Sequence, residues 1–109
     1  MVAKKIRKII SLYKDSLEKK ISIDKLILFG SWAQGKADEE SDIDLMVISP
    51  DFEKFSDKER FSILWDAREK PLTRKVDMDI LGLTPAEFAK ASPLTTLGEI
   101  KETGVEVEV

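Results

Sequence analysis

Two aspartates stand close together on a segment whose other residues are apolar. In a strand over residues 42–49, side chains alternate between the two faces, so Asp42 and Asp44 would share one face. Their Cα atoms would lie about 6.6 Å apart, and like charges this close on a half-buried surface repel each other and raise each other's pKa. A divalent cation would remove this repulsion, and Mg²⁺ prefers oxygen ligands of this kind. The pair therefore predicts a metal site.

A later segment, predicted as a strand over residues 74–81, carries two more candidate ligands. Its residues Asp77 and Asp79 would share one face, and its apolar residues would share the other. If the two strands are neighbours in the sheet, one of these carboxylates can face the earlier pair. Three carboxylates can hold two metal ions about 3.5–4 Å apart for in-line phosphoryl or nucleotidyl displacement, or one of them can serve as a base. The pattern leaves open whether Asp77 or Asp79 is the third ligand.

A phosphate-binding turn is predicted where an apolar strand over residues 25–29 ends at Gly30 and Ser31. Glycine lets the backbone approach a phosphate closely, and the start of a helix offers unpaired N–H groups. Residues 30–36 also fit the G-x-x-x-x-G-K phosphate loop of other nucleotide-binding proteins. That alternative fails because Ala37 replaces the required hydroxyl, and because the next strand begins too soon for a full helix.

The elements that must position these residues follow from the apolar spacing. We expect helices over residues 2–20, 31–37 (short), 57–69, 85–91 and 92–102, and strands over 25–29, 42–49, 74–81 and 105–109. Asp57 is the expected N-cap of the third helix. Trp32 and Trp65 could be interface anchors, but we favour packing of Trp65 from that helix into the core. The order predicts an α/β (α+β) fold, with a small mixed sheet covered by helices, in a single domain spanning residues 1–109.

Composition narrows the classes of site. The chain has 109 residues, 36% of them charged, with a net charge of −3 and neither cysteine nor histidine. A Ser-His-Asp triad, thiol chemistry and an imidazole zinc site are therefore excluded, and strong non-specific nucleic-acid binding is not expected. No apolar run is long enough for a signal peptide or a membrane span, so we expect a cytoplasmic protein. The many Lys and Glu residues and the absence of Asn fit a thermophile bias.

Two segments together resemble a known superfamily. Residues 28–35 (Leu-Phe-Gly-Ser-Trp-Ala-Gln-Gly) and 41–45 (Ser-Asp-Ile-Asp-Leu) resemble the signature of the DNA polymerase beta-like nucleotidyltransferases. The small size and the ten residues between Ser31 and Asp42 resemble the minimal nucleotidyltransferase (MNT) proteins within it. The resemblance implies the nucleotidyltransferase fold over nearly the whole chain.

The resemblance also implies roles for individual residues. Two Mg²⁺ ions would lie on Asp42, Asp44 and Asp77, because Val76-Asp77-Met78 resembles the third-aspartate strand of the family. ATP would be the substrate, held by Gly30, Ser31, Lys36 and Ser41. Relatives often carry an arginine just after Gly-Ser. This chain has Trp32 there, and Lys36 would supply the positive charge instead.

Many small members of the superfamily are MntA-type antitoxins of HEPN–MNT pairs. The resemblance therefore implies a HEPN-type helical protein as partner, and transfer of AMP from ATP to a hydroxyl, in some relatives a tyrosine of the toxin. The alternative is a non-catalytic antitoxin that neutralises its partner by masking it. The edge strand over residues 105–109 could also pair with a second copy of the chain, which would give a homo-oligomer.

Overall fold

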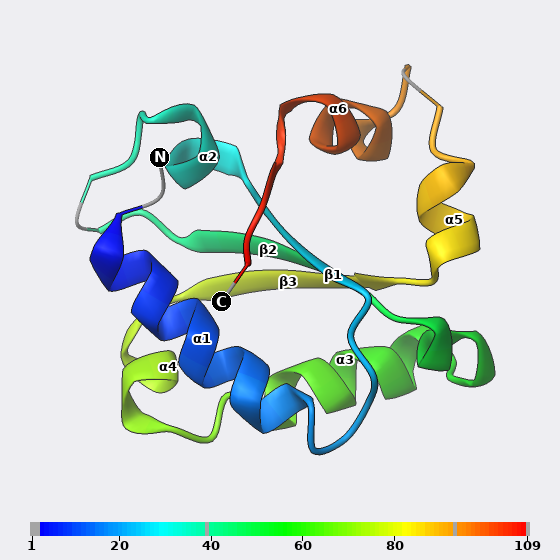
Figure 1. Ribbon diagram of the computed structural model, residues 1–109, viewed down its shortest axis with the longest axis horizontal. Coiled ribbons are helices and arrows are strands. Elements are labelled where there is room, and N and C mark those ends of the chain that lie inside the picture. The colour runs from blue at the N-terminus through cyan, green and yellow to red at the C-terminus, as the bar shows by residue number, and fades with distance from the viewer. Residues whose placement is uncertain (1–2, 39, 93, 109) are drawn as a thin grey trace.

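A mixed four-stranded sheet organises the chain (Figure 1). The computed structural model describes residues 3–38, 40–92 and 94–108. In chain order the elements are α1 (Lys4–Leu17), β1 (Lys25–Phe29), α2 (Gly30–Gln34), β2 (Ile43–Ile48), the 3-10 helix η1 (Pro50–Lys54), α3 (Asp57–Asp66), α4 (Pro71–Lys75), β3 (Met78–Leu83), α5 (Pro85–Ala89), α6 (Thr96–Thr103) and β4 (Val105–Glu106). The sheet order is β3-β2-β1-β4, with β1 antiparallel to β2 and β4, and β2 parallel to β3. The mixed, helix-covered sheet expected from the sequence is confirmed.

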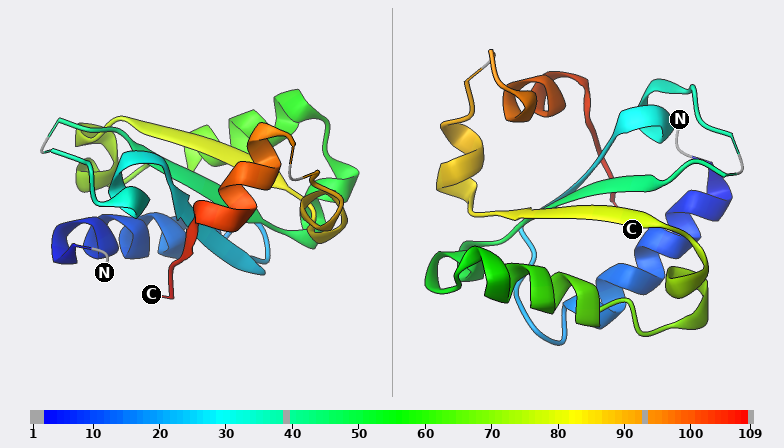
Figure 2. Two further views of the ribbon diagram at one scale, coloured as in Figure 1. Left: turned by 90° about the horizontal axis from the view of Figure 1, so that it is seen from above. Right: turned by 180° about the vertical axis from the view of Figure 1, so that it is seen from behind.

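The central strand β2 is buried on both faces and alternates as predicted. Ile43, Leu45 and Val47 belong to one core, and Met46 and Ile48 belong to a second, smaller one. Helices α1 and α3 cover the first core, and α6 covers the second (Figures 1 and 2). The face of β2 that carries the predicted aspartates is therefore the face toward α6.

Helix α3 connects β2 to β3 and fixes how these strands pair. Its N-cap is Ser56, whose side chain accepts the N–H of Glu59 while Glu59 accepts the N–H of Ser56. The prediction of Asp57 as the N-cap is therefore wrong by one residue, because Ser56 forms this reciprocal capping box. The buried hydroxyl of Tyr13 donates a hydrogen bond of 2.8 Å to the Leu64 carbonyl, which ties α1 to α3 beneath the sheet.

The third strand begins later than predicted. β3 starts at Met78, not at residue 74, and the residues before it form the short helix α4 with Pro71 in its first turn. Proline is well placed at such a position because it lacks the N–H that a first helical turn leaves unpaired. The Arg68 guanidinium then donates to the Val76 carbonyl at 2.8 Å and holds the chain as it enters the strand.

The elements near the two chain ends are of the predicted type, but some of them begin or end at other residues than predicted. α1 lies within the predicted helix over residues 2–20, although residue 2 itself lies outside the described residues. α5 begins where it was predicted, whereas α6 begins at residue 96, with Thr95 as N-cap, and not at residue 92. Pro93 and Val109, which belong to two of the predicted elements, lie outside the described residues. Within the described part of the chain, no helix combines the length and the apolar character needed to cross a membrane.

One prediction about the core is wrong. Trp65 does not pack into the interior, because 58% of it is exposed and it stacks on Phe61, which is 63% exposed, with 6.1 Å between the ring centroids. The Arg68 guanidinium lies 5.1 Å from the centre of the Trp65 ring. Leu64 is the residue of α3 that is buried, so the helix turns its aromatic pair outward.

Candidate active site

Three strands meet at Asp44. It lies opposite Phe29 of β1 on one side and opposite Asp79 of β3 on the other. Residues directly opposite each other in neighbouring strands point to the same face, so the carboxylates of Asp44 and Asp79 share one face. Asp42 precedes β2 by one residue and, by strand alternation, belongs to that face too. Three acidic residues therefore gather at the ends of β2 and β3 where these parallel strands begin.

The electrostatics of Asp44 reflect this gathering. Its pKa is raised above the ordinary value, first because burial disfavours the charged carboxylate, and then because the charges of Asp79 and Asp42 lie nearby. Asp42 and Asp79 themselves are exposed, whereas Asp44 is partly buried. The arrangement costs folding free energy when Asp44 is ionised, and a bound cation would reduce this cost.

Gly30 brings the main chain directly against the Asp44 carboxylate. Its φ is +72°, in the left-handed region that favours glycine, and a Cβ atom at this position would overlap the Asp44 side chain. The turn continues into α2, whose five residues carry only a weak dipole. It ends at Gly35, also at positive φ, and the N–H of Lys36 bonds the Ser31 carbonyl at 3.0 Å. The predicted Gly-Ser turn thus lies beside the predicted carboxylates.

Asp77 does not stand opposite Asp44 in the register, and its role as the third metal ligand stays a prediction. Asp77 precedes β3, and its carbonyl accepts the N–H of Ile43 at 2.9 Å. Asp77 helps to line a hollow of about 730 Å³ near α1 and α4, where Lys5 and Lys8 also lie. The residue that stands opposite Asp44 is Asp79. The sequence offered both residues on one face, and only the register of the two strands distinguishes them.

The loop before Asp42 is held by polar contacts that the sequence analysis missed. The Trp32 indole N–H donates to the Ser41 carbonyl at 3.2 Å. The Ser41 hydroxyl accepts the N–H of Asp38 at 2.9 Å and donates to the Asp38 carboxylate at 3.3 Å. The sequence signal was the Asp-x-x-Ser spacing, which is common in turns closed by a side chain. Ser41, predicted to bind nucleotide, thus uses its hydroxyl to shape this loop, and the predicted ligand Lys36 is exposed.

The acidic residues fit a hard divalent cation in chemistry but do not enclose one. Asp42, Asp44 and Asp79 offer only carboxylate oxygens, the ligand type that Mg²⁺ prefers. Across residues 3–38, 40–92 and 94–108, no three acidic side chains stand close enough to form a metal cage unaided. A metal at this site would therefore need further oxygens, such as those of a triphosphate and water, which is common for Mg²⁺.

Comparison with known proteins places this geometry in a family. The family model described as "Polymerase beta, Nucleotidyltransferase" matches residues 7–92, which include every carboxylate discussed above. The chain belongs to this nucleotidyltransferase family. It is 33% identical over 88 residues to a Methanocaldococcus jannaschii protein named "Putative protein adenylyltransferase", covering 81% of this chain and 82% of that protein. It is 30% identical over 90 residues to "Protein adenylyltransferase MntA" of Thermococcus cleftensis, covering 83% of this chain and 88% of the relative.

A solved structure shares the fold. One chain of the "Crystal structure of the toxin-antitoxin with AMP-PNP" superimposes with a TM-score of 0.61 at 21% identity, covering 97% of this nucleotidyltransferase and 73% of that chain. At this level of identity the likeness concerns the fold. The fold class expected from the sequence is thus confirmed by the family and by the superposition.

Gly30→Ala should destabilise the protein more than Gly35→Ala, and the pair forms a matched comparison. Both glycines have nearly the same positive φ, +72° and +70°, so both alanines incur a backbone cost of about 1–2 kcal/mol. At Gly35 the added Cβ meets open space, whereas at Gly30 it meets the Asp44 carboxylate, which adds about 1 kcal/mol or more. Urea unfolding measures both variants. An equal decrease in the free energy of unfolding for the two variants would show that the close approach to Asp44 does not contribute to the difference in stability.

Asp44→Asn should stabilise the metal-free protein at neutral pH. The folded state raises the pKa of Asp44, so ionisation of this carboxylate destabilises the fold. The gain should be full above the raised pKa, shrink as the pH falls through it, and vanish below the ordinary value of 3.8, where Asp44 is protonated in both states. Thermal unfolding in EDTA across this range measures the gain.

The control for this titration is the exposed residue Asp15 on α1. Asp15→Asn should change the free energy of unfolding by no more than about 0.5 kcal/mol at any pH, as surface substitutions usually do. A gain for Asp44→Asn that did not depend on pH would contradict the charge explanation.

Proposed function

We propose that this nucleotidyltransferase transfers AMP from ATP to a hydroxyl of a partner protein, and that this transfer makes it the antitoxin of a toxin–antitoxin pair. The observation that carries the proposal is the position of Asp44, flanked by Asp79 and Asp42 and touching the Gly30 turn. Carboxylates for metal binding and a close-approach turn for phosphates then meet at one point. This is the combination that nucleotidyl transfer requires.

The proposed reaction is an in-line displacement at the α-phosphorus of ATP. The acceptor oxygen forms a bond to this phosphorus, the bond between the phosphorus and the bridging oxygen breaks, and pyrophosphate leaves. The hydroxyl proton passes to a carboxylate, for which Asp79 at the outer strand is the candidate. The main chain at Gly30, with the Ser31 hydroxyl and Lys36, would hold the triphosphate.

Asp42, Asp44 and Asp79 are the residues that would hold Mg²⁺. The chemistry that the ion supplies when bound is neutralisation of the phosphate charge and a lower pKa of the attacking hydroxyl. The raised pKa of Asp44 supports this assignment, because a group of mutually repelling carboxylates is what a cation stabilises. Two ions, as in the two-metal mechanism, are part of the proposal.

The proposal of a protein acceptor rests on the named relatives. One of them is named as a protein adenylyltransferase, MntA, and a structural neighbour is described as a toxin–antitoxin with AMP-PNP. By extension we propose a toxin of the HEPN type as the partner of this chain, with a tyrosine hydroxyl as the acceptor. The acidic net charge of −3 favours a protein acceptor over a nucleic acid.

The test uses ATP labelled at the α-phosphate, Mg²⁺ and the protein encoded by the neighbouring gene. Asp44→Asn and Asp79→Asn should lower label transfer by about 10²-fold or more, as expected when a catalytic carboxylate is removed. Asp77→Asn should change it by no more than a few-fold, because Asp77 precedes β3 and does not stand opposite Asp44. Loss of transfer in Asp77→Asn, with normal transfer in Asp79→Asn, would assign the third role to Asp77.

Masking without catalysis is the alternative outcome of the same experiment. Full neutralisation of the neighbouring toxin without any label transfer would overturn the enzymatic proposal and favour masking. In that case Asp44→Asn should neutralise the toxin as well as the unaltered chain does.

A further inference from the structure

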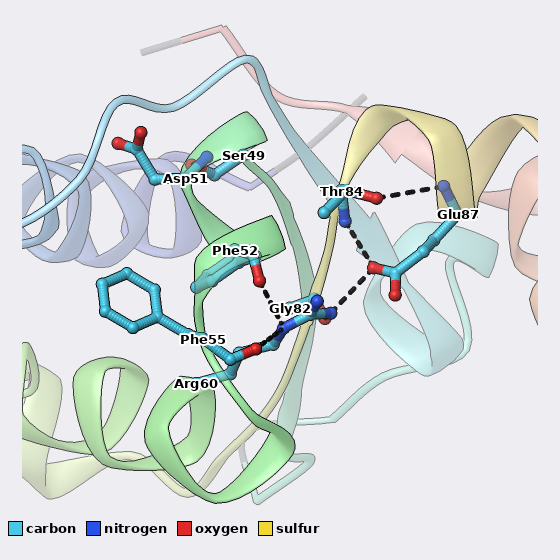
Figure 3. A network of polar contacts seen from close by, with 8 residues as sticks. All are labelled: Ser49, Asp51, Phe52, Phe55, Arg60, Gly82, Thr84 and Glu87. Carbon is cyan, nitrogen blue, oxygen red and sulfur yellow. Dashed lines mark hydrogen bonds and ion pairs between the residues drawn. The ribbon is translucent and has the colours of Figure 1, made fainter.

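Two arginines, Arg60 in α3 and Arg68 just after it, hold the outer edge of β3 near both ends. Arg60 donates to the Gly82 carbonyl at 3.3 Å, and Arg68 donates to the Val76 carbonyl at 2.8 Å. Arg60 is itself fixed by the carbonyls of Phe52 and Phe55 and by Glu87, at 3.0, 3.2 and 2.7 Å (Figure 3). Both guanidinium groups therefore reach the same edge of the strand, one from within the helix and the other from the segment that follows it.

Between these two contacts, main-chain groups of β3 point away from the sheet. Ile43 donates to the Asp77 carbonyl and Ser49 donates to the Leu83 carbonyl, so the odd-numbered residues of β3 turn their main chain toward β2. In a strand the intervening residues turn theirs the other way. The N–H and C=O groups of Met78 and Ile80 therefore face outward, on the last strand of the sheet.

A groove runs beside these groups. It consists of two hollows, of about 240 and 80 Å³, which share Phe61, Leu64 and Ile80 in their lining. Leu64 is buried at its floor, and the stacked rings of Phe61 and Trp65 stand exposed along its rim. An apolar floor beside outward main-chain groups is the arrangement that accepts an added strand.

The groove runs along the strand that carries Asp79. Its smaller hollow is lined by Met78 and Asp79, and Asp79 stands opposite Asp44 in the register. From Met78 to Gly82 the strand edge is about 13 Å long, enough for about four extended residues. By strand alternation the Asp79 carboxylate lies on the opposite face of the sheet from Met78 and Ile80. A strand added at this edge would contact the apolar residues with one set of its alternating side chains and place the other set beside Asp79, which we propose as the acceptor-side base.

We propose that this groove between α3 and the edge of β3 binds an extended segment of the acceptor polypeptide and directs its hydroxyl to Asp79. This inference rests on the proposed function for the identity of the reaction, and on the structure for the location. A polypeptide is the occupant that fits, because outward N–H and C=O groups pair with another main chain. Phe61 and Trp65 supply the apolar contact, and aromatic residues of this kind often dominate binding energy.

The first test measures transfer. With α-labelled ATP and the protein encoded by the neighbouring gene, Phe61→Ala combined with Trp65→Ala should lower transfer by about tenfold or more, which corresponds to the loss of one binding hot spot. Binding of a non-hydrolysable ATP analogue should stay unchanged. Leu94→Ala is the matched control, since Leu94 is a 96% exposed apolar residue on another part of the chain. It should transfer label as the unaltered chain does.

The second test locates the segment without requiring catalysis. Hydrogen–deuterium exchange is measured on Asp44→Asn with and without the same partner, in the absence of ATP. The amides of Met78 and Ile80 should become protected from exchange when the partner is present. A partner that contacts only side chains would leave these amides unprotected.

The outcomes separate the two proposals. Protection of these amides without transfer by the unaltered chain would leave the docking site standing and overturn the proposed reaction. Transfer that persists in the double variant, or a partner that leaves both amides unprotected, would overturn the docking site. A change from dimer to monomer in the double variant, seen by light scattering, would assign the groove to a second copy of this chain and overturn the acceptor role.

Discussion

The parallel pairing of β2 with β3 is the constraint on which the rest of this structure depends. One register places Asp79 opposite Asp44, leaves Asp77 ahead of the strand, and turns the main chain of Met78 and Ile80 to the outside. A parallel pair needs a long crossover, and α3 supplies it. Arg60 of that helix and Arg68 just after it then hold the far edge of β3. A slip of one residue would turn the carboxylate to the opposite face.

The arrangement of the site lowers the stability of the fold locally. Burial and two neighbouring charges raise the pKa of Asp44, and the Gly30 backbone adopts a conformation that places it against the same carboxylate. A fold can retain such a cluster only if other contacts offset it. Here β2 is buried on both faces, and Tyr13 joins α1 to α3 by a buried hydrogen bond. Functional sites commonly combine like charges and restricted backbone in this way.

Local rules were sufficient for much of the fold. Alternation along β2 predicted which residues face which core, and the Thr84-Pro85 pair predicted where α5 begins. These features depend on neighbours in the chain. The errors arose where distant contacts compete. Trp65 has the spacing of a core residue, yet Leu64 occupies the buried position of α3. Residues 74–75 were predicted as strand, but the preceding proline and the Arg68 contact hold them in α4.

The sequence by itself determined the chemistry of this protein, namely the acidic residues, the Gly-Ser turn and their order along the chain, because residue types and strand periodicity are local. It also sufficed to indicate the nucleotidyltransferase family. Only the tertiary structure decided which carboxylate stands beside Asp44, because Asp77 and Asp79 share one face and differ only in register. The same holds for the groove at the edge of β3. It exists because a helix and a strand separated by α4 meet, and no pattern within either segment specifies how they pack against each other.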